Sequence, residues 1–205
     1  MVSATSSTAG RVIRRPRMTP GRQAELLHAA LDALREVGYG GLSMELVASR
    51  AGCSKATLYR QWQTKARMVA AAVRASRPSN THEIDTGSLR GDLLAMVTHL
   101  QADGEHDATL LAAVHHAVLT DETLALAMRT TVLEPVAAQL QRFVGRATDR
   151  GELTGRPTAA EFLHQLVFSL LMVEPIEGAS VDDAFLTRFV DSVLLPALHH
   201  GGRAR

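Results

Sequence analysis

The sequence predicts an all-α protein: a three-helix N-terminal unit with a helix-turn-helix, followed by a larger helical unit. Apolar residues recur at spacings of three and four from residue 26 to residue 194, and no stretch calls for a strand. Two short helical stretches meet at Gly52. The charge also changes sign near residue 77, since Lys and Arg outnumber Asp and Glu by 13 to 4 in residues 1–77, whereas residues 78–205 carry 9 against 17. A basic head on an acidic body is typical of a protein whose first part binds nucleic acid, although chance clustering of solvated charges would give the same totals.

The composition is that of an ordinary globular protein. Of 205 residues, 46% are hydrophobic and 21% are charged, which argues against disorder of the whole chain. Cys53 is the only cysteine, so no internal disulfide can form, which fits a reducing cytoplasm. The N-terminus lacks the apolar region of a secretion signal, and there is no apolar run of about 18 residues that could span a membrane. We therefore expect a cytoplasmic protein.

Residues 1–20 are expected to form a flexible arm, because they are rich in Ser, Thr, Ala and Arg and show no apolar period. The arginines of the arm could reach a minor groove of DNA, or the arm could be a solvated tail. They are Arg11, Arg14, Arg15 and Arg17. A first helix should follow, since its apolar residues share one face before Gly38, Gly40 and Gly41 stop it. These apolar residues are Leu26, Leu27, Ala30, Leu31, Leu34 and Val37.

Three hydroxyl residues are good N-caps for the next three helices. Ser43 should begin a second helix that Gly52 ends, and Ser54 should begin a third over SKATLYRQW. Thr64 should begin a fourth helix that runs to about residue 77, where a Pro-Ser-Asn stretch breaks the pattern. We expect the arm over residues 1–20, the helix-turn-helix unit over 21–64, and a helical unit for ligand binding and dimerisation over 65–205.

The helical pattern continues through the second unit. Helices are expected around residues 89–100, 110–118 and 124–144, and Pro135 should kink the long one or fix its local geometry because proline lacks an amide hydrogen. Two final helices, over 162–171 and 185–194, are apolar around more than half of each turn. That width favours a subunit interface in a homodimer, with two internal core helices as the alternative. The candidate interface residues are Phe162, Leu166, Leu170, Phe185, Phe189 and Val193.

The two short helices around Gly52 fit the helix-turn-helix pattern. Gly52 makes the turn, while Val47, Cys53 and Leu58 fill the wedge between the helices. Leu58 and Trp62, four residues apart, should face inward. The polar side chains of the third helix would then be free to enter a DNA major groove about 12 Å wide. An ordinary surface helix is the alternative interpretation.

Each polar side chain has a chemistry that suits DNA. Lys55 and Arg60 can donate to guanine or to phosphate, and Thr57 can bond a base edge or touch a thymine methyl. Tyr59 can bond a phosphate or pack on a sugar. Lys65 adds a cation to a helix N-terminus that already favours anions, and the two capping serines could donate to phosphate. The candidate DNA contacts are Ser43, Ser54, Lys55, Thr57, Tyr59, Arg60 and Lys65.

Residues 22–75, and above all GLSMELVASRAGCSKATLYRQWQTKARMV, resemble the DNA-binding domain of the tetracycline-repressor (TetR) family of bacterial transcription regulators. The GLS entry, the AGC turn, the TLYR recognition helix and the TK start of helix four occur in order and spacing. The resemblance implies a larger all-helical domain that binds a small molecule and dimerises through its last two helices. It also places Ser43, Lys55, Thr57, Tyr59 and Lys65 at positions of DNA contact. This chain has Gln61-Trp62 where the family commonly has a His-aromatic pair, so the phosphate-contact chemistry at residue 61 should differ.

No motif identifies the small hydrophobic ligand that the resemblance implies. Several side chains on the apolar helices of the second unit could line a cavity, although core packing or a surface position explains each of them as well. These candidates are Met96, His99, His115, Met128, Phe168 and Met172. No cofactor is expected.

An enzyme or a metalloprotein is the rival class, because eight of the nine histidines lie after residue 80. Their spacing does not favour it: the two adjacent pairs point about 100° apart on a helix, and no zincin, P-loop, nucleophile-elbow or dinucleotide motif is present. The sequence therefore predicts a homodimeric regulator that binds a double-stranded DNA operator, a repressor that a ligand releases. A DNA-binding dimer without a ligand, whose second unit serves only dimerisation or protein docking, stays open as the alternative.

Overall fold

The computed structural model describes residues 18–76, 84–102, 108–155, 157–173, 177–178 and 180–200. Over these residues the chain is helical and contains no strand, which confirms the predicted fold class. The four arginines of the arm, the predicted break at 78–80 and the side chain of Met172 lie outside the described residues.

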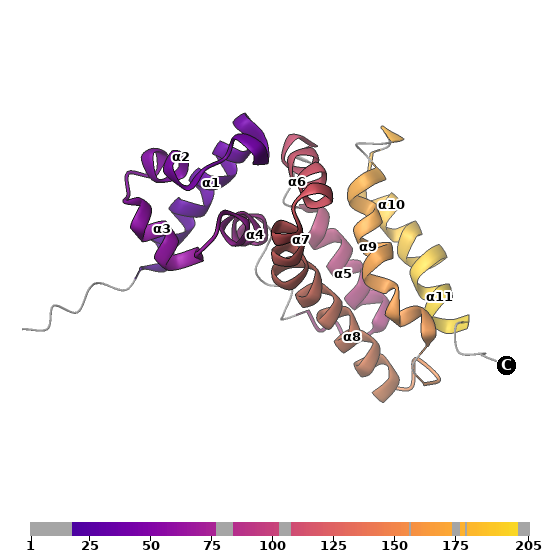
Figure 1. The fold of residues 1–205 in the computed structure, drawn as a ribbon. Helices are drawn as coiled ribbons and strands as arrows, with labels where there is room; N and C mark the ends of the chain where they lie inside the picture. Colours follow the sequence, from indigo (N-terminus) through magenta and orange to yellow (C-terminus); the bar gives the residue numbers. More distant parts are fainter. Residues whose placement is uncertain are drawn as a thin grey trace, which may run out of the picture.

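The helices form a head, made of α1 to α4, and a body, made of α5 to α11 (Figure 1). The head helices are α1 (Pro20–Gly41), α2 (Met44–Arg50), α3 (Lys55–Trp62) and α4 (Lys65–Ala75). The body contains α5 (Leu89–Ala102), α6 (Ala108–Thr120), α7 (Glu122–Met128), the π-helical segment η2 (Arg129–Leu133), α8 (Glu134–Asp149), the 3-10 segment η3 (Thr158–Glu161), α9 (Leu163–Met172), α10 (Asp183–Phe189), the π-helical segment η5 (Val190–Leu194) and α11 (Leu195–His200).

The three predicted N-caps are confirmed. Ser43 Oγ accepts from the amide of Leu46 at 3.1 Å, and Ser54 Oγ accepts from the amide of Thr57 at 3.2 Å. Thr64 Oγ1 does the same for α4 at 3.1 Å. Each hydroxyl thus satisfies one of the backbone amides that a helix start leaves without a partner, which is why these local signals place the helix starts correctly.

Two details of the first helix differ from the prediction. The helix begins at Pro20 with Thr19 as its N-cap, so it takes in the last residue assigned to the arm. Val37 does not share the buried face, since 42% of it is exposed. Gly38 kinks the helix directly afterwards with a φ of 65°, and the residues that close this end of the core are Tyr39 and Leu42 from beyond the kink.

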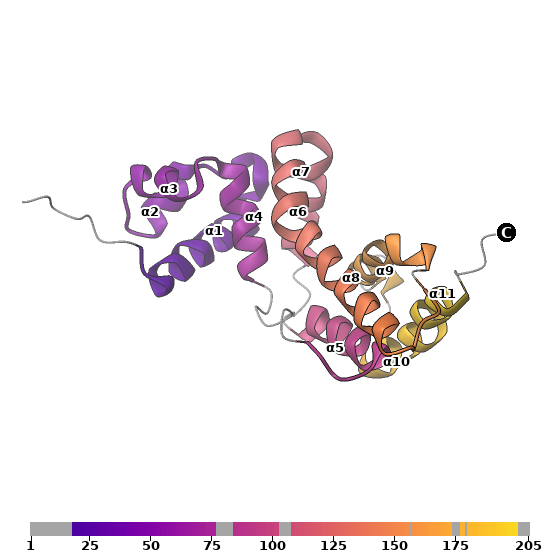
Figure 2. The same ribbon diagram turned by 90° about the horizontal axis from the view of Figure 1, so that it is seen from below.

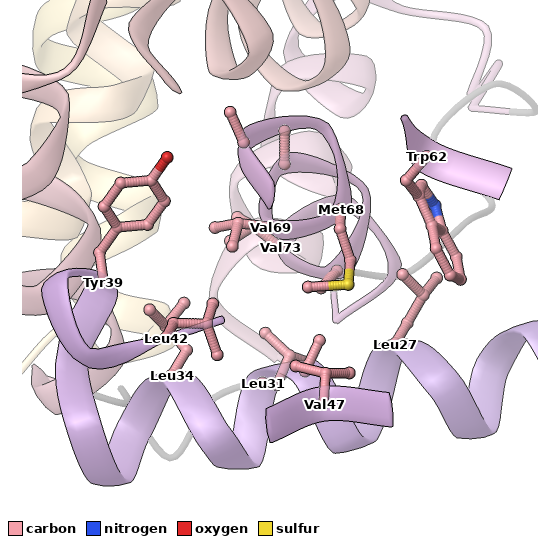
Figure 3. Close-up of a cluster of buried hydrophobic side chains, with 14 of the residues drawn as sticks. Leu27, Leu31, Leu34, Tyr39, Leu42, Val47, Trp62, Met68, Val69 and Val73 are labelled. Carbon is pink, nitrogen blue, oxygen red and sulfur yellow. The ribbon is translucent and has the colours of Figure 1, made fainter. Parts of the chain in front are cut away.

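The head has a core to which every one of its helices contributes (Figure 3). Leu27, Leu31 and Leu34 of α1 face Val47 of α2, Trp62 of α3 and Met68 of α4. The same cluster continues into the body through buried residues of α6, α7 and η2: Val114, Ala117, Leu124, Ala127 and Val132. Head and body therefore share one hydrophobic core, in which α4 packs against α7 and η2 while α1 packs against α6 (Figures 1 and 2).

A second core joins α5 and α8 to the C-terminal helices, with Phe143 as its largest fully buried side chain. The long helix predicted over 124–144 is present, but it widens into the π-helical segment η2 just before Pro135. A proline cannot donate to the carbonyl four residues earlier, here that of Thr131, and the wide turn accommodates this loss. Pro196 follows η5 in the same way.

Candidate nucleic-acid interface

The helix α3 lies at the edge of the head farthest from the body, beside α2 (Figures 1 and 2). Leu58 is fully buried and Trp62 is 6% exposed, so the two predicted anchors hold the helix to the head. At eight residues α3 is too short to be stable alone, since isolated helices need about 12–15 residues to be even marginal in water. Its outward face is therefore presented on a rigid support.

The turn between α2 and α3 is held from both sides. Gly52 adopts a φ of 57°, and the amide of Cys53 donates to the carbonyl of Ala48 at 2.9 Å, which closes the C-terminus of α2 in a left-handed cap. The Arg22 guanidinium of α1 also donates to the carbonyl of Ala51 at 2.6 Å. Sequence reasoning found the glycine but missed Arg22, which lies 29 residues before the turn.

Side chains that suit DNA lie on the outward face of α3. Arg60 is exposed and has no hydrogen-bond or ion-pair partner among the described residues. Tyr59 is 42% exposed, and the Lys55 ammonium lies 5.6 Å from its ring centre. Lys55 also forms an ion pair with Glu45 of α2, which sequence reasoning missed. The ion pair restricts the positions that the Lys55 ammonium can take.

The hydroxyl groups near α3 are engaged with the backbone and with each other. Thr57 is half-buried, and its Oγ1 lies 2.9 Å from Ser54 Oγ. The Ser43 and Ser54 hydroxyls accept from backbone amides, and a hydroxyl that accepts retains its proton for donation. The Ser43 hydroxyl can therefore still donate to a phosphate oxygen, and of Ser54 and Thr57 the hydroxyl that accepts in their mutual hydrogen bond keeps its proton for the same use.

Lys65 begins α4, directly after the turn that ends α3. Its Nζ donates to the carbonyl of Tyr39 at 2.9 Å and lies 4.0 Å from the centre of the Tyr39 ring. An ammonium carries three donors, so this hydrogen bond leaves two for another acceptor. Tyr39 is the aromatic residue in the GYGG stretch, and sequence reasoning gave it no role.

The five candidate ligand contacts whose side chains the structure describes are not gathered in one place. Met96 is fully buried in the second core, whereas Met128 and Phe168 pack half-buried against the first. His99 is half-buried and His115 is exposed to solvent. The spacing of residues along single helices cannot tell which of two cores each helix face joins.

The six candidate interface residues lie at the far end of the molecule from α3. Phe162 is 53% exposed and Val193 is 39% exposed, while Leu166, Phe185 and Phe189 are half-buried. Phe162 precedes α9 rather than lying within it, and Leu170 is 1% exposed because its own chain covers it.

The described residues contain no group of three or more His, Cys, Asp or Glu side chains that could hold a metal ion. Among the helices that the structure describes, none is long and apolar enough to cross a bilayer.

Two family models match the chain. Residues 26–72 match the model of bacterial regulatory proteins of the tetR family, and residues 83–193 match that of the tetracyclin repressor-like C-terminal domain. A DNA-binding transcriptional repressor TetR of Mycobacteroides abscessus is 36% identical over 184 residues, which are 89% of this chain and 96% of that protein. An uncharacterized HTH-type transcriptional regulator of Mycobacterium bovis is 30% identical over 198 residues, covering 97% and 98% of the two chains. Among solved structures, the TetR family transcription regulator SCO0332 superposes with a TM-score of 0.60 at 29% identity, over 86% of this chain and 97% of that one.

Proposed function

Since the chain belongs to the TetR family of DNA-binding transcriptional regulators, we propose that it is a homodimeric repressor that a small-molecule ligand releases from its operator. The name of the Mycobacteroides abscessus relative supports repression rather than activation. The outward face of α3 carries the proposal: Tyr59 and Arg60 are exposed there, Arg60 has no partner within the part of the chain that the structure describes, and Leu58 and Trp62 bury the opposite face of the helix.

In the complex, α3 would enter the major groove and its side chains would divide into two groups. Lys55, Thr57 and Arg60 would contact base edges, with Arg60 donating to guanine O6 and N7. Ser43, Ser54, Tyr59 and Lys65 would contact the phosphate backbone, because hydroxyl and ammonium groups donate hydrogen bonds to phosphate oxygens. Base contacts set the sequence preference, whereas phosphate contacts set the salt dependence of binding.

Dimerisation would use the end of the body that carries α9, α10 and α11. The exposed Phe162 and Val193 and the half-buried Leu166, Phe185 and Phe189 supply an apolar surface there, and Leu170 is not needed for it. A two-fold dimer would place its recognition helices in successive major grooves, about 34–36 Å apart or a multiple of that. The operator would then be near-palindromic.

The dimer would have two states that differ in the distance between its two heads. A ligand would act by binding one state more tightly than the other, because only a difference in affinity shifts an equilibrium. Such coupling is typically about 1–3 kcal/mol, which corresponds to about a 5–150-fold change in affinity. The alternative keeps DNA binding and gives the body only dimerisation or protein docking. A thermal-shift screen with small hydrophobic molecules separates the two, since a stabilising compound that also releases DNA supports the ligand.

Selection of duplexes from a random pool by the purified full-length protein tests the DNA-binding part. We expect an inverted repeat whose half-sites are about 10–10.5 base pairs apart, or a multiple. Arg60→Ala and Thr57→Ala should each change the base preference, at a cost of about 1–3 kcal/mol on the preferred duplex for Arg60. Lys65→Ala should weaken binding to all duplexes and lower the slope of log affinity against log salt by about 1.

Arg129→Ala is the matched control, because Arg129 is also an exposed arginine but lies in η2 of the body. It should leave both the preference and the salt slope unchanged. If the Arg60 and Thr57 variants select the wild-type sequence at every base pair, α3 does not read the groove.

Equilibrium sedimentation tests the dimer, for which Phe162→Glu should increase the monomer fraction.

A further inference from the structure

A hydrogen bond links the head to the body at the N-terminus of α7. The Tyr39 hydroxyl donates to Asp121 Oδ2 at 2.9 Å, across 82 residues of sequence. Tyr39 is only 8% exposed, and Figure 3 shows its hydroxyl turned away from Leu34 and Leu42, the neighbours of its ring. The tyrosine is therefore anchored in the head through its ring and in the body through its hydroxyl.

Asp121 uses its two carboxylate oxygens for two different tasks. Oδ1 accepts from the amide of Leu124 at 2.9 Å and so caps α7, while Oδ2 accepts from Tyr39. The Leu124 amide, followed by the Tyr39 hydroxyl, holds the pKa of Asp121 below its ordinary value, and the charge of Lys65 adds to the effect. Burial and the Asp121 carboxylate raise the pKa of Tyr39, so the tyrosine remains a neutral donor at physiological pH.

Lys65 contacts the backbone carbonyl and the ring of Tyr39. The lysine donates to the Tyr39 carbonyl at 2.9 Å and its ammonium lies 4.0 Å from the Tyr39 ring centre. A lysine side chain is otherwise flexible over four methylene groups, so these two contacts restrict where its ammonium can be. A shift of Tyr39 would move the cation that is proposed to bind phosphate.

We propose that Asp121, a residue of the body, is a positioning residue for DNA binding: it fixes Tyr39, and Tyr39 fixes Lys65 at the edge of the DNA-binding face. The inference rests on the proposed phosphate contact of Lys65. It also gives the body a direct route to the head, because a movement of the N-terminus of α7 that separates Asp121 from Tyr39 releases the lysine. Neither residue has to touch DNA for this to change affinity.

Two substitutions remove the link with little other change. Tyr39→Phe deletes only the hydroxyl. Asp121→Asn retains a good N-cap for α7 but offers one acceptor oxygen in place of two. Asp182→Asn is the matched control, because Asp182 caps α10 through the amide of Phe185 at 2.7 Å and makes no contact with the head among the described residues.

The probe is the duplex that the wild-type protein selects from a random pool, and its affinity is measured by fluorescence anisotropy over a range of salt. Tyr39→Phe and Asp121→Asn should each weaken binding by about fivefold or more and lower the salt slope, while Asp182→Asn should do neither. Thermal unfolding of each variant identifies any that fails to fold, and Tyr39→Phe then decides alone.

A background of Lys65→Ala separates positioning from a general structural effect. If Asp121 acts through Lys65, Asp121→Asn in that background should change affinity by less than about twofold. An equal loss with and without Lys65, or wild-type affinity in both single variants, overturns the positioning role. If Lys65→Ala alone retains wild-type affinity and salt slope, the phosphate contact itself is wrong, which is a distinguishable failure of the proposed function.

Discussion

Asp92 is a buried charged side chain of α5, and its replacement gives a quantitative prediction. The Asp92 side chain is fully buried at the start of α5. It accepts from the Thr86 amide at 2.7 Å, from the Thr86 hydroxyl at 2.9 Å and from the Arg146 guanidinium of α8 at 2.8 Å. These bonds tie the segment before α5 to α8.

Asp92→Asn should lower the free energy of unfolding by about 3 kcal/mol. An asparagine oxygen can keep the bonds to Thr86, but its NH₂ group would face the Arg146 donor, so one charge-assisted hydrogen bond worth about 1.5–3 kcal/mol is lost and two donors oppose each other. Removal of one partner from a buried pair costs about 3–5 kcal/mol, and the low end applies because the Arg146 side chain is 29% exposed and water can reach it. The expected loss is a large part of the total stability of about 5–15 kcal/mol that is usual for a folded protein.

Urea denaturation of the wild type and the variant measures this difference, with Asp85→Asn as the control. Asp85 also faces Arg146, at 3.6 Å, but 58% of its side chain is exposed, so its loss should cost less than about 1 kcal/mol. Burial disfavours the Asp92 carboxylate, but the Thr86 amide and the Arg146 guanidinium outweigh it and hold its pKa below the ordinary value. The carboxylate therefore stabilises the fold fully above its unfolded pKa of about 3.9, and this stabilisation is lost as the pH falls through the lower folded pKa. The difference in free energy of unfolding between wild type and Asp92→Asn should accordingly decrease in acid. A loss of unfolding free energy under about 1 kcal/mol for Asp92→Asn at neutral pH, or a loss equal to that of Asp85→Asn, would refute the reasoning.

Substitutions at four further positions test the backbone and the surface. Gly52→Ala should destabilise the protein by about 1–2 kcal/mol because of its φ of 57°, whereas Gly145→Ala, in the exposed interior of α8 with open space at the Cβ position, should stabilise it by about 0.5–1 kcal/mol in the same denaturation assay. Gln63 ends α3 with a φ of 65°, so Gln63→Gly should relieve strain and raise the midpoint of unfolding slightly, by about 0.5 kcal/mol in free energy, while Gln63→Ala should not. Arg90→Ala removes a two-pronged ion pair to Asp191 at 2.7 and 2.9 Å, but both side chains are at least 40% exposed, so the loss of stability should be small and should shrink further in 1 M salt.

The features that could be predicted from sequence are the ones that local physics decides. An N-cap and the amide it satisfies are three residues apart, so Ser43, Ser54 and Thr64 identify their helices without knowledge of the fold. The Gly52 turn and the inward pair Leu58 and Trp62 are local in the same sense. These signals were enough to place the candidate DNA-binding face.

The features that were missed depend on residues far apart in the chain. Helical periodicity placed Val37 on the buried face of α1, but the kink at Gly38 lets Tyr39 and Leu42 take that end of the core. The ion pair between Lys55 and Glu45, and the bond from Arg22 to Ala51, exist only once the three head helices are packed. No spacing rule along one helix contains that information.

Two further contacts between residues far apart in the chain connect the two ends of α7 to the head. Asp121, just before α7, bonds Tyr39, and the Thr131 carbonyl, just after it, accepts from Arg74 of α4 at 3.3 Å. The second acceptor is available because Pro135 cannot donate to that carbonyl, so the proline that widens the helix also supplies the attachment point. The first contact leads to Lys65 at the start of α4, and the second holds Arg74 near its end. A rotation or slide of α7, which is seven residues and about 10 Å long, would therefore act on α4 near both of its ends rather than at one.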